Sequence, residues 1–202
     1  MRAFYEAWWA ELAPTFAQTT EIYLGHPEHP VVSLTAHDWI QEALPPWRQQ
    51  HIRAAYGLAP APINKAGAKR ADAVSNTAGP VVHSGHWGVK VVRSGNYDIS
   101  LRRWPVEANQ PITASLPAGT DVPGSAKAYR AYPGVAVPAV SASLRIDGQN
   151  RGTKPVSTTD THVTFTTALT ASSHQLAAVF TTAAGDELGA YYVVVTAVAT
   201  IK

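Results

Sequence analysis

The chain has 202 residues, of which 46% are hydrophobic and 15% charged, so it is long enough to bury one substantial core. Its formal net charge of +2 indicates neither a nucleic-acid partner nor an acidic one. Because there is no cysteine, disulfides, thiolate-bound metals and a cysteine nucleophile are excluded. With no membrane span and no signal peptide in sight, we expect a soluble protein, cytoplasmic as expressed, although a fragment of a periplasmic or secreted parent would look the same.

An amphipathic helix is expected at the start of the chain. Phe4, Trp8 and Leu12 recur at intervals of four residues, and Pro14 ends the segment. An aromatic face of this kind needs a packing partner, so we expect Trp8 and Trp9 to enter the core.

Short runs of alternating or β-branched apolar residues then predict a series of strands. A turn pair, Asp147-Gly148, joins two of them as a hairpin. The predicted strands lie at residues 21–24, 31–34, 87–91, 97–101, 144–146, 163–169, 176–180 and 190–198.

These elements predict a mainly β fold, an antiparallel β-sandwich of the jelly-roll type with an N-terminal helix. Residues 1–58 hold the helix and two short strands, and residues 80–202 form the sandwich. Residues 59–79, rich in Ala, Pro, Gly, Lys and Asn, are expected to be a loop or an insertion. We expect 1–58 and 80–202 to form one compact unit.

The run Gly95 to Pro105 is the most specific part of the chain. Its apolar residues alternate with polar ones, as in a half-buried strand, and Pro105 ends the ladder. Adjacent Arg102 and Arg103 are therefore expected to point to opposite faces.

Four segments, taken together and in this order, resemble the C-terminal region of bacterial type I sulfatases, the arylsulfatase family. The later part, with its Gly-x-Tyr strand, Arg-Ile-Asp-Gly hairpin and final apolar strand, also resembles jelly-roll carbohydrate-binding modules. The four segments are Tyr5 to Trp9, Leu34 to Trp39, Trp87 to Pro105 and Leu188 to Val195.

The resemblance implies that the catalytic half of a sulfatase is missing. In that family the nucleophile is a formylglycine made from Cys or Ser in a Cys/Ser-x-Pro/Ala-x-Arg motif within an N-terminal α/β domain. The nearest approximation here, Ser141 to Arg145, lacks Pro or Ala at the third place and lies in a predicted strand. The expected partner is therefore a sulfatase catalytic domain, beside which this sandwich packs in the parent.

Histidines concentrated before residue 87 raise the possibility of a metal site. Two pairs have the spacing His-x-x-His, and imidazole and carboxylate ligands on loops could hold a divalent metal such as zinc or manganese that activates water. The alternative is ordinary hydrogen bonding at the surface. The candidate ligands are His26, His29, His37, Asp38, His83 and His86.

Aromatic residues beside arginines raise the possibility of a sugar site. Aromatic faces stack on pyranose rings, and an arginine can hold a sulfate or carboxylate in bidentate fashion. The alternative is that the tryptophans pack in the core and that one arginine pairs with a carboxylate. The candidates are Trp39, Trp47, Arg102, Arg103 and Trp104.

Two functions of different classes follow. The first is a non-catalytic accessory module derived from the C-terminus of a sulfatase, which binds polysaccharide or, as a variant, acts as a free-standing carbohydrate binder. The second is a small metal-dependent hydrolase of phosphoesters or phosphotriesters, with a His/Asp site on the sandwich loops. A homo-oligomer is compatible with either, whereas nucleic acid and membrane partners are not expected.

Overall fold

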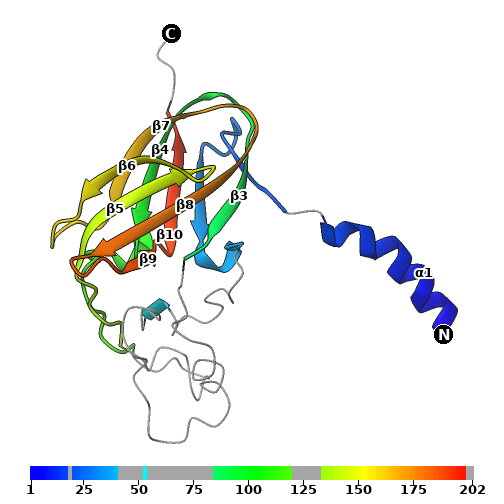
Figure 1. Ribbon diagram of the computed structural model, residues 1–202, viewed down its shortest axis with the longest axis horizontal. Coiled ribbons are helices and arrows are strands. Elements are labelled where there is room, and N and C mark those ends of the chain that lie inside the picture. The colour runs from blue at the N-terminus through cyan, green and yellow to red at the C-terminus, as the bar shows by residue number, and fades with distance from the viewer. Residues whose placement is uncertain (18–19, 41–51, 54–83, 120–132, 199–202) are drawn as a thin grey trace, which may run out of the picture.

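The computed structural model describes residues 1–17, 20–40, 52–53, 84–119 and 133–198. These residues form two facing β-sheets and an N-terminal helix that stands away from them (Figure 1). The predicted mainly β sandwich with antiparallel sheets is confirmed.

The larger sheet has six strands in the order β1-β3-β8-β5-β6, with β9 also paired to β8. All of its pairs are antiparallel except β1–β3, which is parallel. The strands are β1 (Ile22–Leu24), β3 (His86–Val91), β5 (Ala139–Ile146), β6 (Gln149–Pro155), β8 (Ser173–Thr182) and β9 (Glu187–Gly189).

The smaller sheet has four strands in the order β2-β10-β4-β7, all antiparallel. The chain passes repeatedly from one sheet to the other, from β3 to β4 to β5 and again from β6 to β7 to β8, as in a jelly roll. The strands are β2 (Val31–Thr35), β4 (Gly95–Arg102), β7 (Val163–Leu169) and β10 (Tyr192–Ala197).

Alternation of apolar and polar residues places the core between the sheets. Tyr97, Ile99 and Leu101 of β4 are all buried, as the period-two pattern predicts, and so are the alternate residues of β3. The hairpin between β5 and β6 turns at Asp147 and Gly148, whose φ angles of 52° and 74° are those of the turn expected there.

Helix α1 (Arg2–Leu12) has no buried residue. It continues into η1 (Ala13–Ala17), and two further short 3-10 helices, η2 (Ala36–Asp38) and η3 (Val106–Ala108), lie in connections. The expectation that Trp8 and Trp9 enter the core is wrong, because each is 45% exposed and the helix stands clear of the sandwich (Figure 1). Periodicity predicts that a helix has an aromatic face but does not say what covers it.

The predicted loop at 59–79 lies outside the described residues. Among the helices that are described, none is long and apolar enough to cross a membrane.

Candidate functional site

A cleft of about 680 Å³ opens on the outer face of the six-stranded sheet. Strands β1, β3 and β8 and the turn after β5 supply most of its walls. The described residues that line it are Glu21, Ile40, His86, Gly88, Asp147, Ser173, His174 and Gln175.

Alternation along β3 explains why the cleft lies over this strand. Trp87 and Val89 point into the core, so His86 and Gly88 face outward. Gly88 pairs with Gln175 of β8. Gly88 lines the cleft with its backbone alone, whereas the residues around it contribute side chains.

The other side of β3 carries an acidic and an apolar group. Ile40 forms a bridge with His86 through two backbone hydrogen bonds of 2.8 and 3.2 Å. Glu21 immediately precedes Ile22, which pairs with Val89, so Glu21 lies across from Gly88. One wall of the cleft therefore holds a carboxylate and an aliphatic side chain, and the opposite wall holds the amide of Gln175 and the hydroxyl of Ser173.

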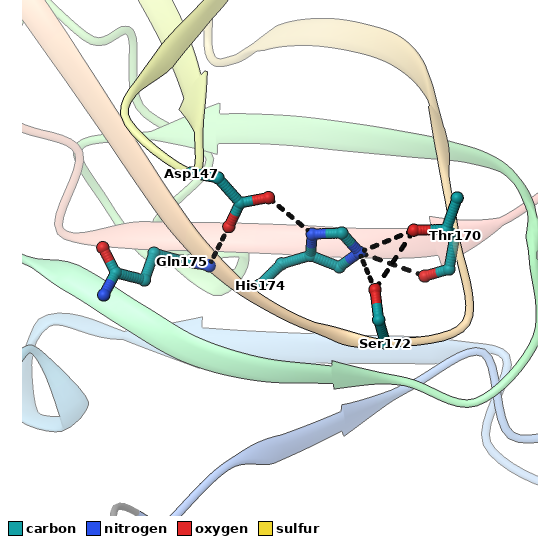
Figure 2. Close-up of polar contacts among 5 residues, drawn as sticks. All are labelled: Asp147, Thr170, Ser172, His174 and Gln175. Carbon is teal, nitrogen blue, oxygen red and sulfur yellow. Dashed lines mark hydrogen bonds and ion pairs between the residues drawn. The ribbon is translucent and has the colours of Figure 1, made fainter.

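Asp147 and His174 both line the cleft. Figure 2 shows the contacts between their side chains. Asp147 Oδ2 lies 2.7 Å from His174 Nδ1, and Asp147 Oδ1 accepts a 2.8 Å hydrogen bond from the backbone N–H of Gln175. Burial raises the pKa of Asp147, but the hydrogen bonds from His174 and Gln175 outweigh it and hold that pKa below its usual value. The turn after β5 is thus tied to the start of β8.

The far side of the His174 ring faces the turn between β7 and β8. Its Nε2 lies 2.9 Å from Ser172 Oγ and 3.0 Å from the carbonyl oxygen of Thr170 (Figure 2). A carboxylate, an imidazole and a hydroxyl in a row resemble a hydrolase triad. However, a carbonyl oxygen can only accept a hydrogen bond, so the contact with Thr170 is a hydrogen bond only when Nε2 carries a proton, and in that state Nε2 cannot take a proton from Ser172. The arrangement therefore holds two turns together.

An aromatic cluster supports the cleft from the core side. The rings of Trp39 and Trp87 have centroids 5.7 Å apart, and Trp39 and Tyr191 are also 5.7 Å apart. Trp87 donates a 2.7 Å hydrogen bond to the carbonyl oxygen of Thr35, which joins the two sheets. Trp39 is consequently buried, and it does not form the sugar platform that we expected.

Four of the candidate metal ligands are divided between the two ends of β2. His26 and His29 lie together before β2, with ring centroids 6.0 Å apart. His37 and Asp38 follow β2, and five strand residues span about 16 Å. His83 lies outside the described residues.

The remaining candidate ligand, His86, lies in β3 beside Ile40. No three His, Asp or Glu side chains in the described part of the chain come together to hold a metal ion. The predicted set is therefore not assembled into one site by the described residues.

Arg103 and Trp104 are core residues. Arg103 is fully buried and donates to the carbonyl oxygens of Ala114 (3.0 Å) and Val135 (2.6 Å), and its guanidinium stacks 4.3 Å from the Trp104 ring centroid. Burial lowers the pKa of Arg103 to about 10, which still leaves the guanidinium charged at neutral pH. Both residues were expected to contact a ligand, but they are packed inside the protein.

Arg102 points the opposite way, as predicted, to the outer face of the smaller sheet. Its Nη2 lies 3.3 Å from His162 Nδ1. Burial, with a smaller contribution from Arg102, lowers the pKa of His162. Arg102 is thus on a different face from the cleft, and Trp47 lies outside the described residues.

Several residues of the cleft were not predicted as site residues. Glu21, Gln175 and Ser173 belong to or adjoin predicted strands, and Asp147 was recognised only as a turn residue. Gly88 carried a usable signal, because a glycine inside an alternating strand marks a place where another molecule can approach the backbone.

No protein-family model matches the chain, and no curated protein matches it. Among solved structures it is similar to a family 35 carbohydrate binding module from an environmental isolate, at 14% identity over 59% of this chain and 73% of that chain, with a TM-score of 0.32. It is also similar to a Podospora anserina GH26-CBM35 β-(1,4)-mannanase (10% identity, 86% of this chain and 29% of that chain, TM-score 0.39). A ruminal GH26 endo-β-1,4-mannanase has 9% identity over 88% of this chain and 28% of that chain, with a TM-score of 0.38. The chain spans under a third of either mannanase. The fold assignment therefore rests on the strand pairings of this chain.

Proposed function

We propose that this β-sandwich is a non-catalytic accessory module that binds carbohydrate in the cleft on the outer face of its six-stranded sheet. The observation that carries the proposal is the make-up of the cleft, a glycine floor surrounded by carboxylate, amide, hydroxyl and imidazole groups. Sugar hydroxyls both donate and accept hydrogen bonds, and these side chains offer both roles. Because the groups stand on paired strands, they are in place before a ligand arrives, which lowers the entropic cost of binding.

The spacing of the two carboxylates favours binding over hydrolysis. Glu21 lies across from Gly88, which pairs with Gln175, and Gln175 lies beside Asp147. Three interstrand steps separate the two backbones by about 14 Å. The carboxyl groups of glycoside hydrolases lie about 5 to 9.5 Å apart, so Glu21 and Asp147 would have to extend toward each other to act as such a pair, whereas Asp147 is held by His174 and Gln175. Both oxygens of Asp147 already accept hydrogen bonds, so this carboxylate serves to hold the cleft.

We also propose that the module derives from the C-terminal region of a type I sulfatase. Three of the four segments that resemble that family contribute one ring each to the aromatic cluster beneath the cleft, namely Trp39, Trp87 and Tyr191. These three segments therefore belong to one packing unit, as expected if they descend together from one parent domain.

Affinity electrophoresis through gels that contain soluble polysaccharides tests the binding function. The panel comprises galactomannan, arabinoxylan, polygalacturonate and chondroitin sulfate. We expect at least one to retard the wild-type protein, and Gly88→Val to lose most of that retardation because its side chain fills the floor of the cleft. Valine suits a strand, so the variant should fold.

Ser33→Val is the matched control, because Ser33 is an exposed strand residue of the smaller sheet. It should migrate like the wild-type protein in every gel. Wild-type mobility unchanged by all four polysaccharides, or retardation of Gly88→Val equal to that of the wild type, would overturn the proposal.

A further inference from the structure

We infer that Tyr23 is the stacking platform of this glycan site and that the site takes an uncharged sugar. The inference rests on the proposed function and adds to it the residue that supplies apolar contact and the class of ligand. It is carried by the position of Tyr23 in β1 and by the partners of the charged groups around the cleft.

Tyr23 lies on the same face of the sheet as the cleft. Its neighbour Leu24 is fully buried, so alternation turns Tyr23 outward, and its side chain is 64% exposed. In the parallel register Tyr23 pairs with Lys90, two residues beyond Gly88 on β3. Outward positions two residues apart on one strand are separated by about 7 Å. Tyr23 is therefore not one of the residues that line the cleft, but it flanks them on the same face of the sheet, beyond Glu21.

Among the described strand residues, Tyr23 is the one aromatic side chain that is largely exposed, since the other exposed aromatics belong to helix α1. Strand β1 is at the edge of the six-stranded sheet, so among the described residues no further strand pairs with it on its outer side. A large exposed ring that adjoins a polar cleft is the arrangement in which an aromatic face meets a ligand that the cleft holds by hydrogen bonds.

Ile40 supplies a second apolar surface on the same side of the cleft. It is 37% exposed and pairs with His86, while Tyr23 pairs with Lys90 at the other end of β3. Glu21 lies between them along this edge. The wall thus alternates apolar, acidic and apolar groups, which matches the apolar faces and hydroxyl edges of a pyranose chain.

The charges around the cleft suit an uncharged ligand. Lys90 donates a 3.2 Å hydrogen bond to Ser173, which leaves its charge in place, but Glu21 on the same face of the sheet carries the opposite charge. The Asp147 carboxylate is held by His174 and Gln175. These groups therefore offer an anionic sugar no net positive charge. Glu21 faces the cleft, where it would repel a sulfate or carboxylate. The two arginines that could have bound such a group lie elsewhere, Arg103 in the core and Arg102 on the other sheet. A neutral sugar would not be repelled by the Glu21 carboxylate.

Isothermal titration with the polysaccharides of the gel panel tests the inference. We expect galactomannan or arabinoxylan to bind more tightly than polygalacturonate or chondroitin sulfate. Tyr23→Ala should weaken binding of the neutral polysaccharide on the order of tenfold, because the stacking surface is lost, whereas Tyr23→Phe keeps the ring and should stay close to the wild type. Tyr5→Ala, which removes an exposed tyrosine from helix α1, is the control and should leave binding unchanged.

Each outcome separates the two proposals. Binding that is lost in Gly88→Val and retained in Tyr23→Ala would keep the carbohydrate site and overturn the role of Tyr23. Preference for chondroitin sulfate or polygalacturonate would overturn the uncharged ligand class. No binding by the wild-type protein to any of the four polysaccharides would overturn the proposed function and this inference with it.

Discussion

Arg103 is a charged residue in the interior of the protein. Its guanidinium is fully buried, two backbone carbonyl oxygens accept its N–H groups, and the Trp104 ring covers it. The adjacent Arg102 is half-buried on the opposite face. Two identical neighbouring side chains therefore have different roles: Arg102 is the last residue of β4, whereas Arg103 lies in the bend that follows the strand and turns into the protein interior.

Replacing each arginine by alanine should reveal this difference. Arg103→Ala leaves the carbonyl oxygens of Ala114 and Val135 buried without their donor, so the free energy of unfolding should fall by about 3 kcal/mol or more. Arg102→Ala should change it by less than about 1 kcal/mol. Urea unfolding measures both. Equal losses in the two variants would contradict the assignment of the faces.

Asp147 makes the stability of the cleft depend on pH. Its pKa is lowered in the folded protein, so it stabilises the fold above the ordinary carboxyl value of about 4, and the contribution disappears as the pH falls through the lower folded value. Asp147→Asn should therefore be less stable than the wild type at pH 6, by about 1 kcal/mol because the side chain is 46% exposed, and by a smaller amount at pH 3. Urea unfolding at the two pH values checks this, and a difference that is the same at both would contradict it.

Among the secondary-structure elements, two strands end in tight turns at glycines with positive φ angles. Gly25, at the end of β1, has a φ of 76° and lies against the hydroxyl of Tyr97 from the other sheet. That hydroxyl donates a 2.6 Å hydrogen bond to the carbonyl oxygen of Arg93. Gly148, in the β5–β6 hairpin, has a similar φ of 74° but has nothing within 4 Å of where a Cβ would stand.

The two glycines allow backbone strain to be separated from steric overlap. Gly148→Ala should lower the free energy of unfolding by about 1 kcal/mol, the cost of a left-handed backbone. Gly25→Ala should cost about 3 kcal/mol or more, because its Cβ also overlaps the Tyr97 hydroxyl. Adding Tyr97→Phe to Gly25→Ala should recover part of that loss. Thermal unfolding provides the comparison, and equal effects at the two glycines would exclude the steric explanation.

In the molecule as a whole, the sandwich and helix α1 differ in how much of their surface is buried. The sandwich buries a continuous core between its sheets, whereas α1 buries no residue and stands apart from the sheets (Figure 1). The helix has its own aromatic contacts, with the rings of Tyr5 and Trp8 5.8 Å apart. The buried core that stabilises the protein therefore lies in the sandwich, which also holds the proposed sugar site.

Deletion of residues 1–17 tests this division. We expect the thermal midpoint of the sandwich to change by no more than about 2 °C, because the removed residues bury nothing in its core. Differential scanning calorimetry measures the midpoint. A loss of several degrees would mean that α1 stabilises the sandwich.

The amino-acid sequence by itself determined most strands, the hairpin turn at Asp147-Gly148 and the opposite faces of Arg102 and Arg103. All of these depend on period-two alternation or turn chemistry, which involve neighbouring residues only. The tertiary structure alone decided that Trp39 is buried, that the histidines around β2 lie at its two ends, and that Tyr23, Glu21 and Gln175 share one face with Gly88. The reason is physical: alternation says which side of a strand is buried, but a cleft depends on which strands pair and in which register, and those contacts join residues that are far apart in the chain.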